Sequence, residues 1–386
     1  MIVIYKKPYY LCFKIFIAPL FLILLETVSI KENAMSNIKI ELTKQSKLKD
    51  LDLENIVFGR EFSDHMFIMD YYDGQWRDAR IEPFKNMEVS PAFLSLHYAQ
   101  SIFEGLKAFY TQNDEIVLFR PQANFARLNK SAERMCIPPI DEAFTLDALK
   151  QLVNIDRAWV PNVKGASLYI RPLIFATDEF VGVKPSETYR FVIFTCPVNK
   201  YYDAPVKVKI EESYTRACSG GVGYSKTAGN YASSLYPTKL AQKEGFDQLI
   251  WTDGKEHKFI EESGTMNLMV VIDGKLITPI SGDTILAGIT RDSVLKIARD
   301  WGMPVEERNL AVQELLDAHA AGTLTEVFGT GTAVTICHII TIGYRGQLLE
   351  LPAVAGRVFS NKVNDQLAKI RLGSEVDKFD WIEKVG

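Results

Sequence analysis

The sequence predicts an α+β fold with two domains. Its 386 residues are enough for two domains, and a composition of 47% hydrophobic and 24% charged residues is typical of a globular protein. Strand-like segments joined by Asp-Gly turns are mixed with helical segments and show no regular βαβ repeat. That order favours mixed, largely antiparallel sheets. The formal net charge of −4 gives no reason to expect nucleic acid or an anionic membrane as a partner.

Cysteine and histidine spacing excludes two further classes. The five cysteines are scattered, which indicates a reducing compartment and no disulfide framework. The five histidines form no cluster with metal-ligand spacing, so we expect no metal site.

Residues 1–34 form an apolar extension. The stretch 11–30 follows two lysines, as in a signal peptide, but Lys14 and Glu26 interrupt the run of about 20 apolar residues that an anchor needs. Met35 opens MSNIKIEL, which is typical of the start of a soluble chain. We therefore expect residues 1–34 not to be translated and the protein to be cytoplasmic, without a membrane partner. A real signal or anchor is the alternative.

Residues 35–201 are expected to form the smaller domain. An Asp-Gly pair at 73–74 indicates a hairpin. Apolar residues at helical spacing predict a helix over 121–135. A second helix is expected to be capped by Thr145 and to end before Pro161.

Two strands follow in the same domain. Alternation over 167–175 places Tyr169 and Arg171 on one face, either as a solvated edge or in a pocket for an anion. Because Pro172 has no N–H to donate, we expect this strand to lie at a sheet edge or to end there. Residues 189–196 have the apolar composition of a buried strand.

Residues 202–216 are expected to connect the domains, and 217–386 to form the larger one. Asp-Gly pairs at 253–254 and 273–274 each indicate a turn between two strands. A later strand over 326–336 is predicted to enter a turn of small residues.

A helix is predicted over 288–302. Val294, Ile297 and Trp301 form its apolar face, and Gly302 ends it. Its first residues, Gly-Ile-Thr, offer free backbone N–H groups to an anion.

Residues 220–234 read GGVGYSKTAGNYASS, in which glycines precede Lys226 and Tyr231 follows five residues later. The spacing does not match the phosphate-binding loop G-x-x-x-x-G-K-[ST]. Small neighbours leave room for a flat cofactor beside a reactive lysine amine. From these residues alone, a flexible surface loop remains the alternative.

The motifs that follow this lysine occur in a recognisable order. They are EESGTMN at 261–267, GITR at 288–291 and GTGTA at 329–333. From about Phe58 to its C-terminus, the chain resembles the branched-chain amino acid aminotransferases, which are fold-type IV pyridoxal-phosphate enzymes. The resemblance implies a small α/β domain and a larger domain with a mixed, largely antiparallel, barrel-like sheet. It also implies a homodimer that reversibly moves the amino group of leucine, isoleucine or valine to 2-oxoglutarate with pyridoxal 5′-phosphate.

The resemblance also assigns cofactor contacts. Lys226 would bind pyridoxal phosphate as a Schiff base and carry the substrate's proton, and Tyr231 would donate a hydrogen bond to the phenolic oxygen of the ring. Glu262 would face the pyridine nitrogen, with Glu261 as the alternative, because neighbours in a strand point in opposite directions. The implied phosphate contacts are Arg127 (alternative Arg120), Ile289, Thr290 and Thr332.

Substrate contacts follow from the same resemblance. They are Tyr98, Phe103, Tyr169, Arg171, Tyr201 (alternative Tyr202), Thr265, and the backbone N–H groups of Thr332 and Ala333. Aromatic walls suit aliphatic side chains. A D-amino acid aminotransferase and an aminodeoxychorismate lyase on the same fold are the alternatives. Mammalian-type members carry C-x-x-C after GTA, but here the stretch is Val-Thr-Ile-Cys, which leaves no dithiol switch at this point.

Overall fold

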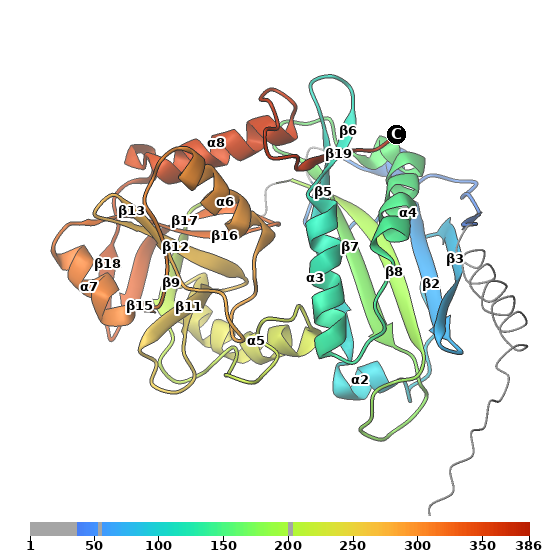
Figure 1. Ribbon diagram of the computed structural model, residues 1–386, viewed down its shortest axis with the longest axis horizontal. Coiled ribbons are helices and arrows are strands. Elements are labelled where there is room, and N and C mark those ends of the chain that lie inside the picture. The colour runs from blue at the N-terminus through green and yellow to red at the C-terminus, as the bar shows by residue number, and fades with distance from the viewer. Residues whose placement is uncertain (1–36, 53–55, 200–203) are drawn as a thin grey trace, which may run out of the picture.

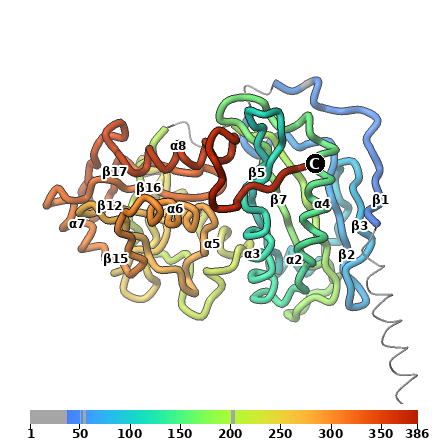
Figure 2. Tube along the Cα trace, turned by 45° about the horizontal axis from the view of Figure 1, so that its top comes forward, coloured from blue at the N-terminus to red at the C-terminus, as the bar shows by residue number. Residues whose placement is uncertain are grey.

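Two β-sheets flanked by helices make up the computed structural model, which describes residues 37–52, 56–199 and 204–386 (Figure 1). The two sheets lie side by side, as two views of the molecule show (Figure 2). The expected α+β class, with a mixed and largely antiparallel barrel-like sheet, is confirmed.

The apolar extension 1–34 and Met35 lie outside the described residues. Among the residues that are described, no helix combines the length and the apolar character needed to cross a bilayer.

The first sheet has nine strands in the order β1-β3-β2-β8-β7-β5-β6-β19, with β4 also paired to β7. Its strands are β1 (Lys39–Ile40), β2 (His65–Tyr72), β3 (Gln75–Pro83), β4 (Ser101–Phe103), β5 (Leu106–Tyr110), β6 (Ile116–Phe119), β7 (Ser167–Ala176), β8 (Tyr189–Val198) and β19 (Ile382–Lys384). The helical elements in this part of the chain are η1 (Leu48–Asp50), α2 (Leu94–Tyr98), α3 (Pro121–Arg134), α4 (Glu142–Ile155) and η2 (Arg157–Trp159). Helices α3 and α4 bury one apolar face of the sheet, as Phe125 and Leu149 pack in the same cluster as Phe67.

The hairpin predicted at the first Asp-Gly pair is confirmed. Asp73 and Gly74 have φ values of 50° and 74° between β2 and β3. Two successive positive φ angles are what a tight two-residue hairpin turn requires.

The expectation that β7 lies at an edge is wrong. It pairs with β8 along its whole length and with β5 and β4 on the other side. Pro172 lies at the break between those two partners, where its carbonyl accepts from the N–H of Glu104 at 2.8 Å. Because the N and C=O of one strand residue point the same way, the missing N–H also faces this break, and the proline costs no ladder bond.

Thr145 does not cap the second helix. The helix α4 begins at Glu142, and the Asp141 side chain accepts from the Phe144 N–H. Thr145 lies one turn inside and donates its hydroxyl to the Asp141 carbonyl at 2.6 Å. Asp and Thr are both good caps, so composition alone did not choose between them.

The second sheet has ten strands in the order β14-β13-β12-β16-β17-β9-β10-β11-β15, with β18 paired to β17. They are β9 (Val206–Ile210), β10 (Gln248–Thr252), β11 (Phe259–Ser263), β12 (Met266–Ile272), β13 (Lys275–Thr278), β14 (Val305–Glu307), β15 (Leu310–Ala311), β16 (Leu324–Gly331), β17 (Thr335–Tyr344) and β18 (Gln347–Glu350). An additional pairing of β12 with β11 closes six of these strands into a barrel.

Four α-helices surround the barrel. They are α5 (Ala228–Lys243), α6 (Ile289–Asp300), α7 (Val312–Ala320) and α8 (Phe359–Arg371), with the short turn η3 (Val354–Gly356) before α8. The predicted helix corresponds to α6, with Gly302 at φ 73° just after its end. The helices α5, α7 and α8 were not predicted from the sequence.

The two sheets are joined by apolar contacts. Phe109 and Phe119 of the first sheet belong to the same buried cluster as residues of α6 and α8, including Val294 and Leu367. The expected connector contains the barrel strand β9, and the C-terminal strand β19 returns to pair with β6. The chain therefore crosses between the sheets more than once, which fixes one against the other.

Candidate active site

A cavity of about 450 Å³ lies between the two sheets. Its walls come from β4 and β7 on one side and from β11, β12, β16 and the starts of α5 and α6 on the other. The sequence-predicted residues that line it are Phe103, Arg127, Tyr169, Arg171, Lys226, Tyr231, Glu262, Thr265, Ile289, Thr290, Thr332 and Ala333.

Lys226 is held at its backbone and directed into this cavity. Its N–H donates to Ser131 Oγ at 2.9 Å, and its carbonyl accepts from the Phe103 N–H at 3.0 Å. The side-chain Nζ donates to the Tyr231 hydroxyl at 2.7 Å. Lys226 precedes α5 and Tyr231 lies in its first turn, so the five-residue spacing brings the amine and the phenol together.

Arg127 is locked by a buried carboxylate. It donates from Nε and Nη2 to the two oxygens of Glu104, at 2.7 and 2.8 Å, and from Nη1 to the Ala287 carbonyl. Glu104 is fully buried. Burial raises the pKa of Glu104, but the charge of Arg127 outweighs it and leaves the pKa below its ordinary value. The guanidinium is thus fixed at the cavity wall before any ligand arrives.

Unsatisfied donors gather beside Arg127. Ile289 and Thr290 form the first turn of α6, whose leading N–H groups have no partner within the helix. The buried Thr330 hydroxyl faces the same cavity and has no hydrogen-bond partner among the described residues. A Cβ on Gly288 would collide with the Asn267 amide oxygen, so glycine is needed where the chain turns into α6. This corner can bind an anion.

Arg120, the alternative to Arg127, is engaged elsewhere. It donates to Ser293 Oγ at 2.7 Å and forms an ion pair with Asp292 at 2.6 Å, both on α6. It is not among the residues that line the cavity.

Glu262 presents a buried carboxylate to the opposite part of the cavity. It forms an ion pair with Arg216 at 2.7 Å and accepts from Asn267 Nδ2 at 3.0 Å. Burial raises its pKa, and Arg216 opposes that rise. Glu261 does not line the cavity. Adjacent strand residues point to opposite faces, so only one of the two carboxylates reaches it.

Aromatic residues and one arginine form the wall from the first sheet. Arg171 donates to the Tyr169 hydroxyl at 2.8 Å, and its guanidinium lies 4.6 Å from the centre of the Phe103 ring. Phe58 packs edge-on against Tyr169 at 5.2 Å. Arg171 forms no ion pair among the described residues, and its Nε lacks a hydrogen-bond partner there. The wall is apolar with a cation in it.

Three predicted substrate contacts need separate mention. Tyr98 ends the short helix α2, is 38% exposed and does not line the cavity in this chain. Tyr201 and its alternative Tyr202 lie outside the described residues.

Comparisons with known proteins agree with this geometry. Residues 101–341 match the family model described as amino-transferase class IV. The chain is 45% identical to branched-chain-amino-acid aminotransferase 2 of Bacillus subtilis (strain 168), over 90% of this chain and 97% of the relative. The chain belongs to the branched-chain-amino-acid aminotransferases of the class IV family.

Solved structures of other aminotransferases share the fold. A branched-chain aminotransferase from the archaeon Thermoproteus uzoniensis, crystallised with norvaline, aligns with a TM-score of 0.69 and 26% identity, over 83% of this chain and 100% of that one. The branched-chain amino acid aminotransferase from Thermobaculum terrenum, in its PLP-containing holo-form, aligns with a TM-score of 0.66 and 21% identity, over 83% of this chain and 98% of that one. The two alternative activities on this fold are not favoured.

Class IV aminotransferases use pyridoxal phosphate, and the residues of this aminotransferase fit that group. The anion corner beside Arg127 suits a phosphate, with the orphaned Thr330 hydroxyl as a further donor. The small residues around Lys226 leave space for a flat ring, and Ala228 lines the cavity next to it. Glu262 supplies a carboxylate across the same space.

Sequence reasoning missed four residues that support this site. Glu104 fixes Arg127, Arg216 and Asn267 hold Glu262, and Thr330 offers a hydroxyl. Asn267 could have been found, because the Gly264 turn pairs it directly across from Glu262 in the β11–β12 hairpin. Glu104 gave no signal, since it follows the short strand β4 at a break in the sheet.

Proposed function

We propose that this aminotransferase moves the amino group of leucine, isoleucine or valine to 2-oxoglutarate, and back, in the cavity between the sheets. The observation that carries the proposal is the Lys226 amine, 2.7 Å from the Tyr231 hydroxyl, in a cavity that also holds Glu262 and an anion corner. A lysine amine, a buried carboxylate and an anion corner are together what pyridoxal chemistry needs.

Four parts of the chain would hold pyridoxal phosphate. Arg127 and the first turn of α6 would bind its phosphate, Tyr231 and Lys226 would contact its oxygen side, and Glu262 would face its ring nitrogen. When bound, the cofactor supplies a carbonyl group for the amine and a ring that stabilises negative charge at the substrate Cα. Glu262, fixed by Arg216 and Asn267, would keep a proton on that nitrogen.

Lys226 would also carry the proton. Its Nζ lies over the rings of Phe103 and Tyr231, at 4.9 and 5.2 Å from their centres. An amine in that position can remove a proton from the substrate Cα, and it can return a proton to that atom when the reaction runs in reverse.

The wall from the first sheet accounts for two kinds of substrate. Phe103, Tyr169 and Phe58 offer apolar surface to an aliphatic side chain. Glutamate carries a second carboxylate, and Arg171, which has no acidic partner among the described residues, can pair with it. Thr265 and the N–H groups of Thr332 and Ala333, in the turn that follows β16, would bind the carboxylate common to both.

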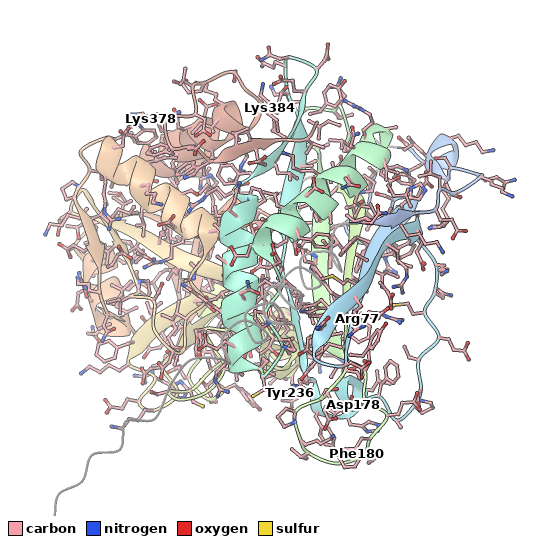
Figure 3. The ribbon with its side chains drawn as sticks, turned by 45° about the vertical axis from the view of Figure 1, so that its right-hand side comes forward. Arg77, Asp178, Phe180, Tyr236, Lys378 and Lys384 are labelled. Atoms are coloured by element: carbon pink, nitrogen blue, oxygen red, sulfur yellow. The ribbon has the colours of Figure 1, made fainter. Side chains whose placement is uncertain are left out.

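A homodimer in the cytoplasm completes the proposal. Apolar side chains are exposed on two segments, the loop between β7 and β8 and the helix α5: Phe180 46%, Val181 70%, Val183 87%, Leu235 69% and Tyr236 60%. Figure 3 labels Phe180 and Tyr236 toward the same end of the molecule. An exposed apolar surface of this kind is typical of an interface, and a second copy is the partner that the family resemblance implies.

The test is a transamination assay on the purified, cofactor-loaded protein. We expect glutamate to form from 2-oxoglutarate with leucine, isoleucine and valine, and the cofactor absorbance to change when leucine is added alone. D-Alanine in place of leucine should give no glutamate, and aminodeoxychorismate should release no pyruvate. Turnover of either compound without turnover of leucine would overturn the proposal in favour of an alternative activity.

A further inference from the structure

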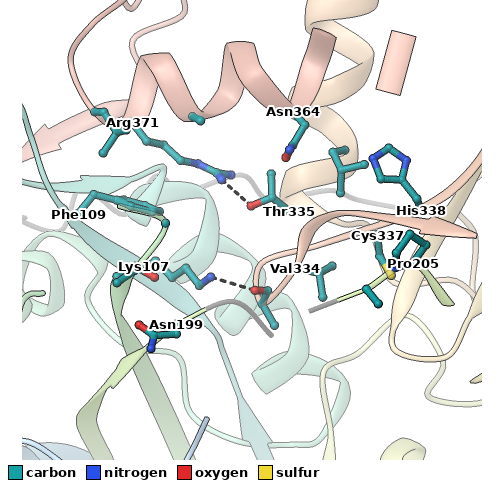
Figure 4. A pocket seen from close by; sticks show the side chains of 18 residues that line it. Lys107, Phe109, Asn199, Pro205, Val334, Thr335, Cys337, His338, Asn364 and Arg371 are labelled. Atoms are coloured by element: carbon teal, nitrogen blue, oxygen red, sulfur yellow. Dashed lines mark hydrogen bonds between the residues drawn. The ribbon is translucent and has the colours of Figure 1, made fainter. Parts of the chain in front are cut away.

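A second cavity, of about 350 Å³, lies behind the turn that follows β16. Figure 4 shows its lining, drawn from β5, the turn, β17 and α8. Ala333 and Val334 line this cavity as well as the first one, so the turn is a shared wall. None of the roles assigned above uses this second space.

Lys107 and Arg371 reach the turn from different elements, β5 and α8 (Figure 4). Lys107 is 9% exposed, and its Nζ donates to the Ala333 carbonyl at 2.9 Å. Arg371 is 6% exposed, and its Nη1 donates to the Thr335 hydroxyl at 2.7 Å. Among the described residues, each cation therefore donates to one neutral acceptor, and Arg371 also lies over the rings of Phe109 and Phe119.

No carboxylate compensates these two charges among the described residues. The charged neighbour of Lys107 is Arg371, which repels it. Burial, with that repulsion, lowers the pKa of Lys107 to about 7, and burial lowers the pKa of Arg371 to about 10. The Nε of Arg371 also lacks a hydrogen-bond partner there. Two like charges in a buried place are costly unless a counter-charge joins them.

The other titratable groups around the cavity do not supply that counter-charge. Burial raises the pKa of the Cys337 thiol to about 12 and that of Cys196, which faces Lys107, to about 11. Burial lowers the pKa of His338, so its ring is neutral near pH 7 and carries no negative charge at any pH. Among the described residues that line the cavity, none therefore supplies the negative charge.

We propose that this cavity is a second binding site for a small aliphatic carboxylate, whose carboxylate group lies between Lys107 and Arg371. Both cations are more than nine-tenths buried and line a space large enough for a small organic acid. The rest of the lining is partly apolar, with Phe109, Pro205, Val334 and Ile336, which suits a short aliphatic body better than an inorganic anion.

The site would be separate from the substrate position. A ligand here contacts the face of the turn opposite the first cavity, so both can be filled in the same chain. Because Lys107 and Arg371 donate to the turn at Ala333 and Thr335, a carboxylate that recruits these donors acts on the wall of the first cavity. Occupancy of the second site is therefore expected to change the affinity of the first.

The test is calorimetric titration of the cofactor-loaded protein with 4-methylpentanoate, an acid that has no amino or keto group to react. We expect two molecules bound per chain. Arg371→Leu should bind one, with the second site weakened at least about tenfold by loss of a charged hydrogen-bond donor. Arg371→Lys, which keeps a cation, should still bind two.

A second variant guards against misfolding of the first. Ala368 is exposed on α8 at the rim of the cavity, so Ala368→Trp should block the cavity without removing a charge and should also bind one molecule. One molecule per chain in the unmodified protein, or two in both Arg371→Leu and Ala368→Trp, would overturn the proposal.

Two further titrations test which ligand the second site binds and whether its binding depends on the proposed transamination. Inorganic phosphate should not displace 4-methylpentanoate from the second site, and displacement at equal concentration would overturn the carboxylate assignment. Lys226→Ala should keep the second site, because Lys226 does not line this cavity. A failure of the proposed transamination would therefore leave this result unchanged.

Discussion

The two cavities on either side of the turn after β16 differ in how they treat buried positive charge. In the first, two arginines are paired with buried carboxylates, Arg127 with Glu104 and Arg216 with Glu262, each at 2.7 Å, although Arg171 has no acidic partner among the described residues. In the second, Lys107 and Arg371 donate to neutral acceptors, the Ala333 carbonyl and the Thr335 hydroxyl, and no carboxylate among the described residues lines the cavity. Arg371 also lies over the Phe119 ring, 4.3 Å from its centre. One fold therefore carries both arrangements in two cavities that share Ala333 and Val334 as a wall.

The difference separates two ways of preparing a site for an anion. A guanidinium clamped by a carboxylate is already oriented, so a ligand finds it in place and loses little entropy in ordering it. An uncompensated cation is less stable in the empty site, and a ligand that neutralises it gains that energy on binding. We expect the first cavity to be sensitive to loss of its fixed partners and the second to pH and to added anions.

Removal of the reactive amine should have the largest effect. Lys226→Ala should lower kcat for leucine by about 10³-fold or more, because the same amine would anchor the cofactor and carry the proton. The fold should persist, and the phosphate corner should still retain cofactor without a covalent bond. Steady-state kinetics, with thermal unfolding as the control, measure this. Leucine turnover near the unmodified rate would remove Lys226 from the mechanism.

The next largest effect tests the two adjacent carboxylates. Glu262→Gln should lower kcat by about 10²–10³-fold, because a neutral amide cannot hold the charge on the ring nitrogen. Glu261→Gln is the matched control and should change kcat little, since that side chain does not line the cavity. If the two variants show the reverse order, the role belongs to Glu261.

Loss of a clamping carboxylate should cost stability in the first cavity. Glu104→Gln leaves Arg127 buried without its counter-charge and should lower the free energy of unfolding by about 3–5 kcal/mol. Bound cofactor should restore part of the loss if its phosphate lies against Arg127. Urea denaturation with and without cofactor measures both quantities.

The second cavity provides the contrast for that experiment. Arg371→Leu removes a cation that has no carboxylate partner among the described residues, so it leaves no carboxylate unpaired and should change the free energy of unfolding much less than Glu104→Gln does. An equal loss in both variants would show that pairing does not distinguish the two cavities.

The sequence located most of the first cavity because its chemistry lies in short motifs. Lys226 and Tyr231 are within one loop and helix turn, and the Asp-Gly pair at 273–274 forms the hairpin that the pattern predicted. Local signals of this kind survive folding, since a two-residue turn with positive φ at both positions is specified by its own residues. The helix α8 could also have been found, because its apolar residues recur at helical spacing.

Long-range contacts explain what the sequence did not show. The break between β4 and β5 puts Pro172 inside a central strand, and no local pattern indicates that break. Arg371 lies 264 residues after Lys107 in the chain, and their approach depends on α8 packing over β17 and beside β6. The second cavity could therefore not be predicted from the sequence, because it depends on how the sheets and α8 pack together.

The last prediction concerns the pH dependence of stability at Lys107. Its pKa in the folded chain is about 7, against an ordinary value of 10.5 in the unfolded chain. Between these values the unfolded chain binds more protons, so the contribution of this group to the free energy of unfolding rises with pH. Below about pH 7 both states are protonated, and the folded protein carries the full cost of the buried charge.

Lys107→Met isolates that contribution, since methionine does not titrate. Relative to the unmodified protein, the variant should be favoured most below about pH 7, and its advantage should shrink as the pH rises toward about 10. Urea denaturation across this range measures the difference, with Lys164→Met, at an exposed lysine, as the control. Added 4-methylpentanoate should narrow the advantage at the acidic end, because the carboxylate stabilises the protonated Lys107 and the variant lacks that partner. A difference that stays constant with pH would mean that Lys107 is compensated in the folded protein, and the contrast between the two cavities would then rest on Arg371 alone.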